Sequence, residues 1–368
     1  MKKVFVFTSV HQWNDVRIFH KEATSLSKHF DVELHAPADF EHKLVGSINV
    51  YGLPKWVKVS DRKIIRAELW KRIKKTEADI FHFHDPELIF IGFYLKIFLK
   101  KKVIFDVHEN VSLQILNKDY IPTKFLRKLV SVFFSIIERI AVKTFNGVVV
   151  AGGDILSMCS KRTVINNYPI INKLVDEKPK ADNTIAYLGG ITKIRGVEEV
   201  LKAIRIVNKK TNRNLRMKLI GEFSDKAYKD YILNEYSNII DFLGWVERTS
   251  ALNETRKSII GIVLYLPVPN HMYLRSNKIF EYMEAGIPVL FSNFEDWKHR
   301  LDDFNVGLSA DPTDPNDIAN QILWILDNPA EANKMGVNGS KTIVSTFNWD
   351  IEKNKLIDLY MKIIQNEK

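Results

Sequence analysis

The run SNKIFEYMEAGIPVL at residues 276–290 decides the fold that we expect for the later part of the chain. Ser276 or Asn277 can cap a helix, Gly286 can end it, and the proline two residues later starts a short apolar strand. The run therefore predicts a compact unit of helix, turn and strand, as found in α/β domains.

The first turn of this helix carries a charge that opposes the helix dipole. Lys278 lies where unpaired backbone N–H groups already make the helix start positive, and a bound anion would relieve that conflict. Glu281 follows three residues later on roughly the same face. This face thus offers amides and an ammonium group for phosphate and a carboxylate for sugar hydroxyls, which suits a nucleotide. The alternative is an ordinary surface helix with an exposed lysine and glutamate.

The order S-N-K-I-F-E-Y-M-E-A-G-I-P-V resembles the donor-binding segment of the glycogen-synthase-like retaining glycosyltransferases, glycosyltransferase family 4, of the polysaccharide-assembly type. The resemblance implies an α/β protein with the GT-B fold, in which two Rossmann-like domains face each other across a cleft. It also implies that Glu281 binds the donor ribose and that amides near Asn277 and Lys278 hold the diphosphate. Many members carry a second glutamate eight residues earlier, where this chain has Tyr273. The transferred sugar must therefore be handled differently, or by a neighbouring residue.

Length and composition favour two domains in a reducing compartment. The 368 residues exceed one ordinary core, and a hydrophobic fraction of 46% is enough for two domains of about 150–180 residues each. The single cysteine, Cys159, excludes a disulfide framework and a cysteine-based zinc site, so a cytoplasmic location is expected. The net charge of +10 suits phosphorylated ligands, a polyanion or an anionic membrane surface. Because the sequence has no zinc-finger spacing, RNA-binding aromatic signature or long basic tail, no nucleic-acid partner is expected.

The first loop of the chain contains candidate acceptor residues. Apolar residues 4–7 predict a buried strand, followed by a polar loop and a helix that ends near His29. Members of the family often have a glycine-rich turn in this loop, where this chain has HQWND at residues 11–15. A similar Asp-x-Arg-Ile arrangement occurs in some polysaccharide-assembly enzymes, so Asp15 and Arg17 are candidates for contact with the acceptor or the sugar. The alternative is that Asp15 caps the helix and Arg17 lies on the surface.

Polar side chains also follow two later strands of this domain. His82 and His84 alternate onto one face of a strand and could share a metal ion, but no third ligand is fixed by the sequence. The family works without a metal, so we expect no metal, a packed His82 and a His84 that faces the crevice. The next strand ends near His108, where open α/β sheets bind ligands. In the family a histidine here contacts the transferred sugar, and Asp106 and Glu109 would orient it or meet the acceptor hydroxyl.

Two apolar helices are expected in the first domain. Residues 87–99 are too short to span a bilayer, which needs about 20 apolar residues, and predict a buried helix with a cationic C-terminus. Residues 122–144 carry more apolar surface than one sheet covers, beside several Lys and Arg side chains. Such a helix is typical of a membrane interface. We therefore expect this domain to rest on the anionic inner leaflet of the plasma membrane, where it reaches a lipid-linked acceptor.

The second domain opens with a strand that leads into a candidate phosphate loop. Gly189 and Gly190 are followed by Lys193, Arg195 and a helix, and such a loop binds phosphate through backbone N–H groups and cations. The loop resembles the first loop of the family's nucleotide domain, in which an arginine follows the glycine and a lysine precedes the second glycine. Arg195 takes the lysine position, but Gly190 replaces the arginine. One phosphate-binding cation is therefore missing, and Lys193 or Lys278 is expected to compensate.

A later Phe-x-Gly-Trp-Val turn resembles the family's base-binding loop. Trp245 would pack on the nucleobase there, and the alternative is plain core packing. The residues that we expect to bind the donor are Gly189, Gly190, Lys193, Arg195, Glu222, Trp245, Tyr273, Ser276, Asn277, Lys278 and Glu281. The catalytic residues that the resemblance implies are His108, Arg195, Lys278 and Glu281.

The domain boundaries follow from the composition of the chain. We place an acceptor domain at residues 1–167, a charged linker at 168–183 and a nucleotide-sugar domain at 184–348. Residues 349–368 predict an amphipathic helix. The resemblance implies that this helix crosses back to the first domain.

The resemblance implies that the protein is a retaining glycosyltransferase. It would move a sugar from a nucleoside diphosphate sugar, with UDP as the favoured nucleotide, to a glycan or lipid-linked acceptor in bacterial surface polysaccharide synthesis, without a cofactor. A GT-B nucleotide-sugar epimerase, which uses water in place of the acceptor, is an alternative. A non-catalytic protein that binds an anionic membrane or nucleic acid would explain the net charge, but not a phosphate loop paired with a ribose carboxylate.

Overall fold

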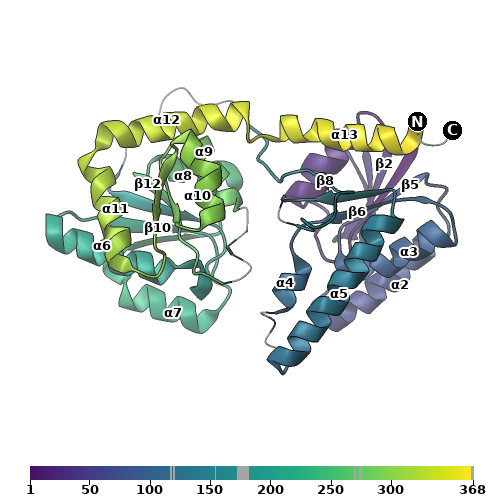
Figure 1. Ribbon diagram of the computed structural model, residues 1–368, viewed down its shortest axis with the longest axis horizontal. Helices are drawn as coiled ribbons and strands as arrows, with labels where there is room; N and C mark the ends of the chain where they lie inside the picture. Colours follow the sequence, from purple (N-terminus) through teal and green to yellow (C-terminus); the bar gives the residue numbers. More distant parts are fainter. Residues whose placement is uncertain are drawn as a thin grey trace. The chain divides into compact units, whose positions relative to one another are not determined.

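The computed structural model describes residues 1–116, 118, 121–153, 155–171, 182–268, 271–272 and 276–365. The chain forms two compact units (Figure 1). Unit 1 comprises Met1–Asn167 with Trp349–Lys368, and unit 2 comprises Tyr168–Asn348. In each unit, helices cover both faces of a sheet. The expectation of two Rossmann-like α/β domains is confirmed.

The sheet of unit 1 has the strand order β3-β4-β2-β1-β5-β6-β7-β8. Its strands are β1 Lys3–Phe7, β2 Asp31–Pro37, β3 His42–Val45, β4 Ile48–Leu53, β5 Ile80–Phe83, β6 Lys102–Val107, β7 Gly147–Val150 and β8 Thr163–Val164. Neighbouring strands pair in parallel, apart from the antiparallel hairpin of β3 and β4. Alternation along β1 sends Phe5 and Phe7 into one core and Val4 and Val6 into the other.

The helices of unit 1 cover the two cores. One face of the sheet carries α2 Arg62–Ile73, α3 Ile89–Ile97 and α5 Lys124–Thr144, with α4 Val111–Ile115 packed against α5. The other face carries a π-helix Val16–Ala23, α1 Thr24–Leu26 and α13 Trp349–Gln365. In α13, Leu356, Tyr360 and Ile363 are buried at helical spacing, so this last helix completes the core of unit 1.

The helix after the first loop differs from the expectation. It is a π-helix, Val16–Ala23, followed by the short α1, and it ends before His29. Because the turn is wider than in an α-helix, residues five apart in the sequence lie over one another. The Nε atom of Arg17 and the Oε1 atom of Glu22 consequently lie 3.0 Å apart. This contact contributes to the site described below.

Unit 2 is a doubly wound sheet in the order β11-β10-β9-β12-β13-β14, with parallel neighbours. Its strands are β9 Thr184–Leu188, β10 Arg216–Ile220, β11 Ile240–Gly244, β12 Ile260–Val263, β13 Val289–Ser292 and β14 Gly307–Ala310. Its helices are α6 Val197–Thr211, α7 Lys226–Glu235, α8 Arg248–Arg256, α9 Asn277–Ala285, α10 Glu295–Leu301, α11 Pro315–Asp327 and α12 Pro329–Ser345.

The run at residues 276–290 folds as the sequence predicts. Helix α9 ends at Gly286, whose φ of 70° lies in the left-handed region that favours glycine. The backbone N–H of Gly286 donates to the carbonyl oxygen of Met283 at 3.1 Å, and β13 follows. The buried side of α9 packs on the sheet, so the helix start lies at the carboxyl edge of the strands.

Helix α3 differs from the buried helix that we expected. Its buried side is narrow, because Ile89, Gly92 and Leu95 alone among its residues are fully covered in the part of unit 1 that the structure describes. Phe90 and Phe98, within and just after the helix, are 66% and 71% exposed. The prediction failed because the segment is apolar all round, so its sequence does not show which side faces the sheet. Among the described residues, no helix is long and apolar enough to cross a membrane.

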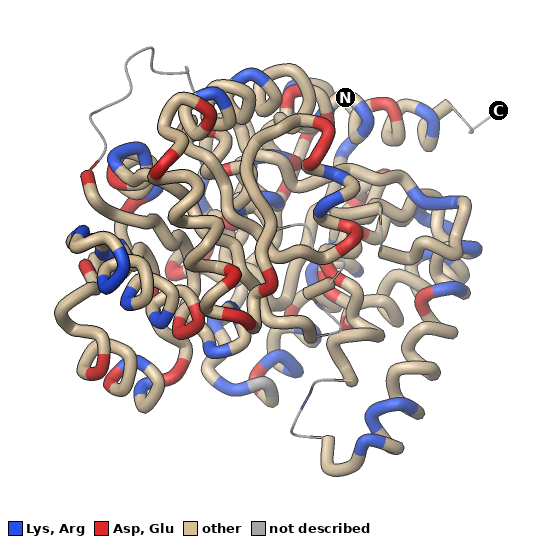
Figure 2. Tube along the Cα trace, turned by 60° about the vertical axis from the view of Figure 1, so that its left-hand side comes forward, with Lys and Arg blue, Asp and Glu red and all other residues tan. Residues whose placement is uncertain are grey.

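Helix α5 exposes a broad apolar face, as the sequence predicts for residues 122–144. Its exposed apolar side chains are Phe125, Leu126, Leu129, Val132, Phe133, Ile136 and Ile140. Lys and Arg positions recur along the same helix (Figure 2). The helix therefore combines uncovered apolar area with positive charge.

The inner side of α5 buries a carboxyl group. Glu138 is 2% exposed, and Ala141 and Val142, one turn later, are buried as well. Burial raises the pKa of Glu138 from 4.5 to about 7. The protonated group is tolerated in the core, whereas the ionised group opposes folding.

We expect Glu138→Gln to increase the free energy of unfolding above neutral pH and to change it little in acid. Because the folded pKa is raised, the wild-type protein loses stability as the pH rises from 4.5 to about 7, by at most about 3 kcal/mol. Urea unfolding at about pH 5 and about pH 8 measures the effect. Glu331→Gln, at an exposed position of α12, is the control and should leave the pH dependence unchanged. A wild-type protein equally stable at both pH values would contradict the prediction.

Candidate functional site

The strand order of unit 2 reverses between β9 and β12. The chain runs outward from β9 to β10 and β11, returns to β12 and then continues to the other edge. At such a reversal the loops after the two central strands diverge, and the resulting crevice is where open α/β sheets bind ligands. The loop after β9 begins with Gly189, and the segment after β12 contains Tyr265.

The turn after β9 lies against the start of α9. Gly189 has a φ of +103°, a conformation that L side chains rarely adopt. A Cβ atom on Gly189 would lie 2.8 Å from Cε and 2.9 Å from Nζ of Lys278. The structure thus joins the two predicted phosphate-binding elements, the glycine turn and the helix start, because glycine leaves room for the lysine.

A second cation reaches the same turn. Arg195 donates from Nη1 to the carbonyl oxygen of Gly190 at 2.8 Å. Its guanidinium carbon lies 5.5 Å from the centre of the Tyr265 ring, and Nζ of Lys278 lies 5.7 Å from the same point. Two positive charges therefore converge at the reversal of the sheet.

Tyr265 connects these groups, and the sequence analysis missed it. Lys278 donates from Nζ to the Tyr265 hydroxyl at 3.1 Å, and Oγ of Ser276 lies 3.2 Å from that hydroxyl. Burial alone would raise the pKa of Tyr265, but the charges of Lys278 and Arg195 outweigh burial and hold the pKa below its usual value. Ser276 precedes α9 without capping it through its side chain. Nothing in the neighbouring sequence marks the tyrosine, so its contacts alone reveal it.

The turn after β11 presents an aromatic ring to solvent. Trp245 is 74% exposed, so the alternative of core packing is wrong. Its backbone N–H donates to Oε1 of Glu222 at 3.0 Å, and Gly244, with a φ of +68°, brings the backbone close to the same oxygen. Glu222 therefore fixes the turn and leaves the indole ring available for stacking.

The structure brings together part of the residue set predicted for the donor. Gly189, Gly190, Arg195, Ser276 and Lys278 are connected by the contacts above.

The other residues predicted to bind the donor are not connected by these contacts. Lys193 and Asn277 are exposed, and Glu281 is half-buried in α9, about one turn after its start. Tyr273 lies outside the described residues.

In unit 1 the strand order reverses between β1 and β5, and Asp85, just after β5, holds the loop that follows β1. Its Oδ2 atom accepts hydrogen bonds from the Thr8 hydroxyl at 2.7 Å and from the Ser9 backbone N–H at 2.6 Å. The carboxylate is buried, 2% exposed, at the carboxyl end of β5. Asp85 was not among the predicted site residues, although its position directly after a buried strand was a usable signal.

His11, in the loop after β1, is a further residue that the sequence analysis did not select. Its Nδ1 lies 3.4 Å from Oδ2 of Asp15, and its Nε2 lies 3.6 Å from Oδ1 of Asp85. Its ring centre is 5.0 Å from that of His108. Burial would lower the pKa of His11, but Asp15 and Asp85 outweigh burial and raise it. Two imidazoles therefore lie side by side at this edge of the sheet.

His108 stands over two buried side chains. Its Nε2 lies 3.1 Å from Nδ1 of His84 and 3.7 Å from Oδ2 of Asp106. His84 is buried, so it supports His108 from below and does not face a crevice as we expected. Burial lowers the pKa of His84, which favours the neutral imidazole. Glu109, next in the chain, is exposed.

Arg17 is the clearest departure from the predicted site. It is 3% exposed, so a surface Arg17 is wrong. Its guanidinium group donates to both carboxylate oxygens of Asp106 at 3.0 Å and to the carbonyl oxygen of Ile165 at 3.0 Å. Its contacts thus lie inside unit 1, where it positions Asp106. Asp15 caps the π-helix, as the alternative reading had it, by accepting from the Arg17 and Ile18 backbone N–H groups at 2.8 and 3.0 Å.

A buried cluster with metal-binding chemistry lies beneath these residues: Glu22, His82, His84 and Asp106, whose ligand atoms all lie within 4.8 Å of one another. Arg17 already places a positive charge 3.0 Å from Glu22 and 2.9 Å from Asp106. We therefore interpret the cluster as an ion-pair network that supports His84 and His108. His82 is packed, as expected, with Nδ1 2.8 Å from the Tyr360 hydroxyl.

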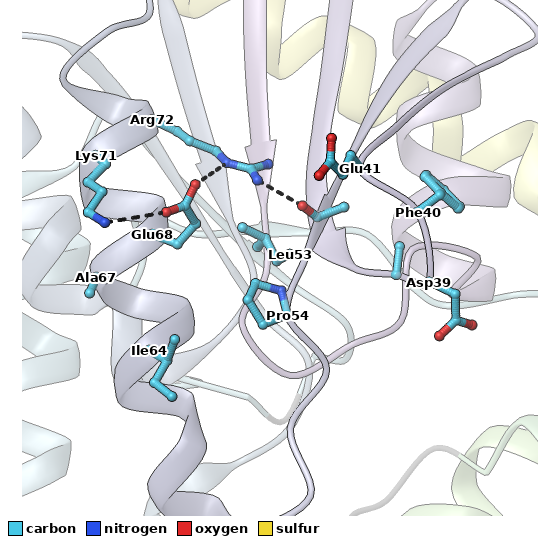
Figure 3. Close-up of a pocket in the computed structure, with 12 residues that line it drawn as sticks. Asp39, Phe40, Glu41, Leu53, Pro54, Ile64, Ala67, Glu68, Lys71 and Arg72 are labelled. Atoms are coloured by element: carbon cyan, nitrogen blue, oxygen red, sulfur yellow. Dashed lines mark hydrogen bonds and ion pairs between the residues drawn. The ribbon is translucent and has the colours of Figure 1, made fainter.

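A pocket of about 590 Å³ lies elsewhere in unit 1, between α2 and the loop after β2 (Figure 3). Arg72 donates to Oε1 of Glu68 at 3.0 Å and to the carbonyl oxygen of Gly52 at 2.8 Å. Asp39 and Glu41 also line the pocket, and the carboxylates of the pocket would repel a phosphate. Among the described residues, its lining shares no member with the predicted site.

Residues 172–342 match the family model described as "Glycosyl transferases group 1". No curated protein sequence matches the chain.

Several solved structures are similar over nearly the whole chain. Sucrose-phosphate synthase from Thermosynechococcus elongatus is 14% identical, with a TM-score of 0.78 and 100% of both chains covered. HepE from Anabaena, in complex with UDP, is 12% identical, with a TM-score of 0.71, over 98% of this chain and 100% of that chain. WaaG, a glycosyltransferase involved in lipopolysaccharide biosynthesis, is 12% identical, with a TM-score of 0.68, over 96% and 98%. At these identities the likeness shows the fold.

We expect Arg17→Met to destabilise the protein by about 3–5 kcal/mol, because it leaves the carboxyl groups of Asp106 and Glu22 buried without their cation. Denaturant unfolding measures the loss. The matched control is Arg213→Met, which removes an exposed ion pair with Asp327 and should cost less than about 1 kcal/mol. Equal costs for the two variants would show that the buried network does not stabilise unit 1.

Proposed function

We propose that the chain is a retaining glycosyltransferase, which transfers a sugar from a nucleoside diphosphate sugar to a glycan or lipid-linked acceptor. The match of residues 172–342 to the family of group 1 glycosyl transferases supports the proposal. One observation carries the proposal. Arg195 and Lys278 converge on the Gly189 turn, at the carboxyl ends of the two central strands of unit 2. Two cations, turn amides and a helix start together match the charge of a diphosphate.

The same groups suit the chemistry of sugar transfer. When the bond between the sugar and the diphosphate breaks, negative charge builds on the leaving oxygen. Cations already in place stabilise that charge without reorganising during the reaction. We assign this task to Arg195, Lys278 and the N-terminal amides of α9, which begins at Asn277.

We assign the nucleoside to the remaining donor residues. Trp245 would stack on the base from the turn that Glu222 holds, and Glu281 would accept hydrogen bonds from the ribose hydroxyls. Lys193 and Tyr273 stay candidates for contact with the diphosphate and the sugar. UDP is the favoured nucleotide, because the similar HepE structure contains UDP.

We assign the transferred sugar and the acceptor to the loops of unit 1. His108 would contact the sugar, held in place by His84 and Asp106. Asp15, which is partly exposed beside His11, and Glu109, which is exposed, would meet acceptor hydroxyls. The similar WaaG acts in lipopolysaccharide biosynthesis, and this supports a surface polysaccharide or its lipid-linked precursor as the acceptor.

We further propose that unit 1 rests on the cytoplasmic face of an anionic membrane. The docking surface is the α3–α5 face, which we define by its exposed apolar side chains: Phe90, Ile97, Phe98, Phe125, Leu129, Val132, Phe133, Ile136 and Ile140. Helices α3 and α5 contact each other, so we treat their exposed apolar side chains as one docking surface. Lys124, Lys128, Arg139 and Lys143 are exposed on α5, and their positive charge complements anionic headgroups.

We expect one nucleoside diphosphate out of UDP, GDP, TDP and ADP to stabilise the protein. At about 100 times its dissociation constant, a ligand adds about 2.7 kcal/mol to the folded state, which a thermal unfolding scan detects. Arg195→Ala and Lys278→Ala should each weaken this binding at least about tenfold, since each removes a charge-assisted contact.

The control for these two variants is Lys202→Ala, which removes an exposed lysine of α6 and should keep the full shift. If no nucleoside diphosphate shifted the unfolding of the wild-type protein, the donor site would be wrong. If the two alanine variants bound normally, the nucleotide would have to sit elsewhere.

We expect Phe125→Ser combined with Phe133→Ser to release the protein from vesicles of anionic lipid at low salt. The pair removes two largely exposed rings from the α3–α5 face. The matched control, Val337→Ser with Val344→Ser, removes exposed apolar groups from α12 and should bind vesicles as the wild type does. Vesicle flotation measures the bound fraction. A wild-type protein that ignored anionic vesicles would contradict the docking surface.

A further inference from the structure

The best-defined residue of the site without an assigned role is Tyr265. It follows β12 at the reversal of the sheet in unit 2, and its side chain is 1% exposed. Its hydroxyl contacts Nζ of Lys278 at 3.1 Å and Oγ of Ser276 at 3.2 Å. Its ring also carries the guanidinium group of Arg195 on one side. Tyr265 thus contacts both cations of the proposed donor site.

The chemistry of this contact differs from an ordinary ion pair. Within the described residues, no carboxylate lies within ion-pair distance of Lys278, and its ammonium group is held by a phenol. A carboxylate would fix the lysine but would also neutralise it. A neutral hydroxyl orients the ammonium group and leaves its positive charge available for an incoming anion. Such an arrangement suits an ammonium group that is ordered before a phosphate binds.

We propose that Tyr265 is a positioning residue of the donor site, whose hydroxyl holds the ammonium group of Lys278 against the Gly189 turn so that it is ordered before the diphosphate binds. The inference rests on the proposed function. A lysine side chain has four rotatable bonds, and fixing it on binding costs entropy. A side chain that is already held avoids most of that cost, and preorganisation of this kind increases affinity.

The test is a double-mutant cycle on the affinity for the nucleoside diphosphate, measured by titration calorimetry. Tyr265→Phe should weaken binding by about tenfold, since the entropy of a lysine side chain is on the order of the 1.4 kcal/mol that corresponds to that factor. In a Lys278→Ala background, Tyr265→Phe should have no further effect, because the hydroxyl acts through the lysine.

The control is Tyr231→Phe, which removes a hydroxyl that contacts Glu198 on α6 and should bind normally. Normal affinity in Tyr265→Phe would overturn the inference and leave the donor site standing. An equal loss in both backgrounds would overturn it too, because the tyrosine would then act by holding the fold. Absence of nucleotide binding in the wild type would overturn the proposed function and the inference together.

A second measurement uses the unaltered protein and does not depend on the folding of a variant. Lys278 and Arg195 outweigh burial and hold the pKa of Tyr265 below its usual value; His271, Tyr187 and Tyr282 are the other titratable groups nearby. A bound diphosphate neutralises the two cations, so it should raise that pKa. Titration of the tyrosinate absorbance in the near ultraviolet, with and without nucleoside diphosphate, follows the change. A titration curve that the nucleotide leaves unchanged would overturn the inference.

Discussion

Parallel pairing of the central strands is the constraint on which the whole arrangement depends. Parallel strands bring their carboxyl ends to one edge of a sheet, and a reversal of strand order opens space at that edge. In unit 2 the reversal collects the glycine turn after β9, the tyrosine after β12 and the start of α9. In unit 1 it collects the loop after β1 and the ends of β5 and β6. Residues far apart in the sequence therefore meet without long loops.

Local sequence patterns predicted most of the fold, because the spacing of apolar residues along the chain differs between strands and helices. The run at 276–290 gave its helix, glycine stop and strand correctly. The hairpin of β3 and β4 was not predicted, since its edge strand has no buried face to impose alternation. The π-helix was not predicted either, because the contact between Arg17 and Glu22 that its wider turn permits leaves no periodic signal in the sequence. The prediction that α3 is buried was wrong, because the helix has no polar side to show which of its faces is exposed.

The site was predictable where chemistry lies within a few residues, and unpredictable where it depends on contacts between distant segments. Lys278 opposes a helix dipole, and Gly189 ends a strand, so each carries its own signal. Tyr265, His11 and Asp85 acquire significance through partners on other elements. Residues 172–342 match a family model, but the roles of the individual side chains are those proposed from geometry.

The helix α13 gives unit 1 an unusual order of assembly. Although Trp349–Lys368 follows unit 2 in the chain, Trp349 donates from Nε1 to the Ser25 hydroxyl and Tyr360 contacts His82. During synthesis the ribosome must release the whole of unit 2 before the segment that closes the first core becomes available. The core around β1 and the π-helix therefore cannot be completed until α13 has been synthesised. The contact of Tyr360 with His82 in the histidine network of unit 1 cannot form before then either.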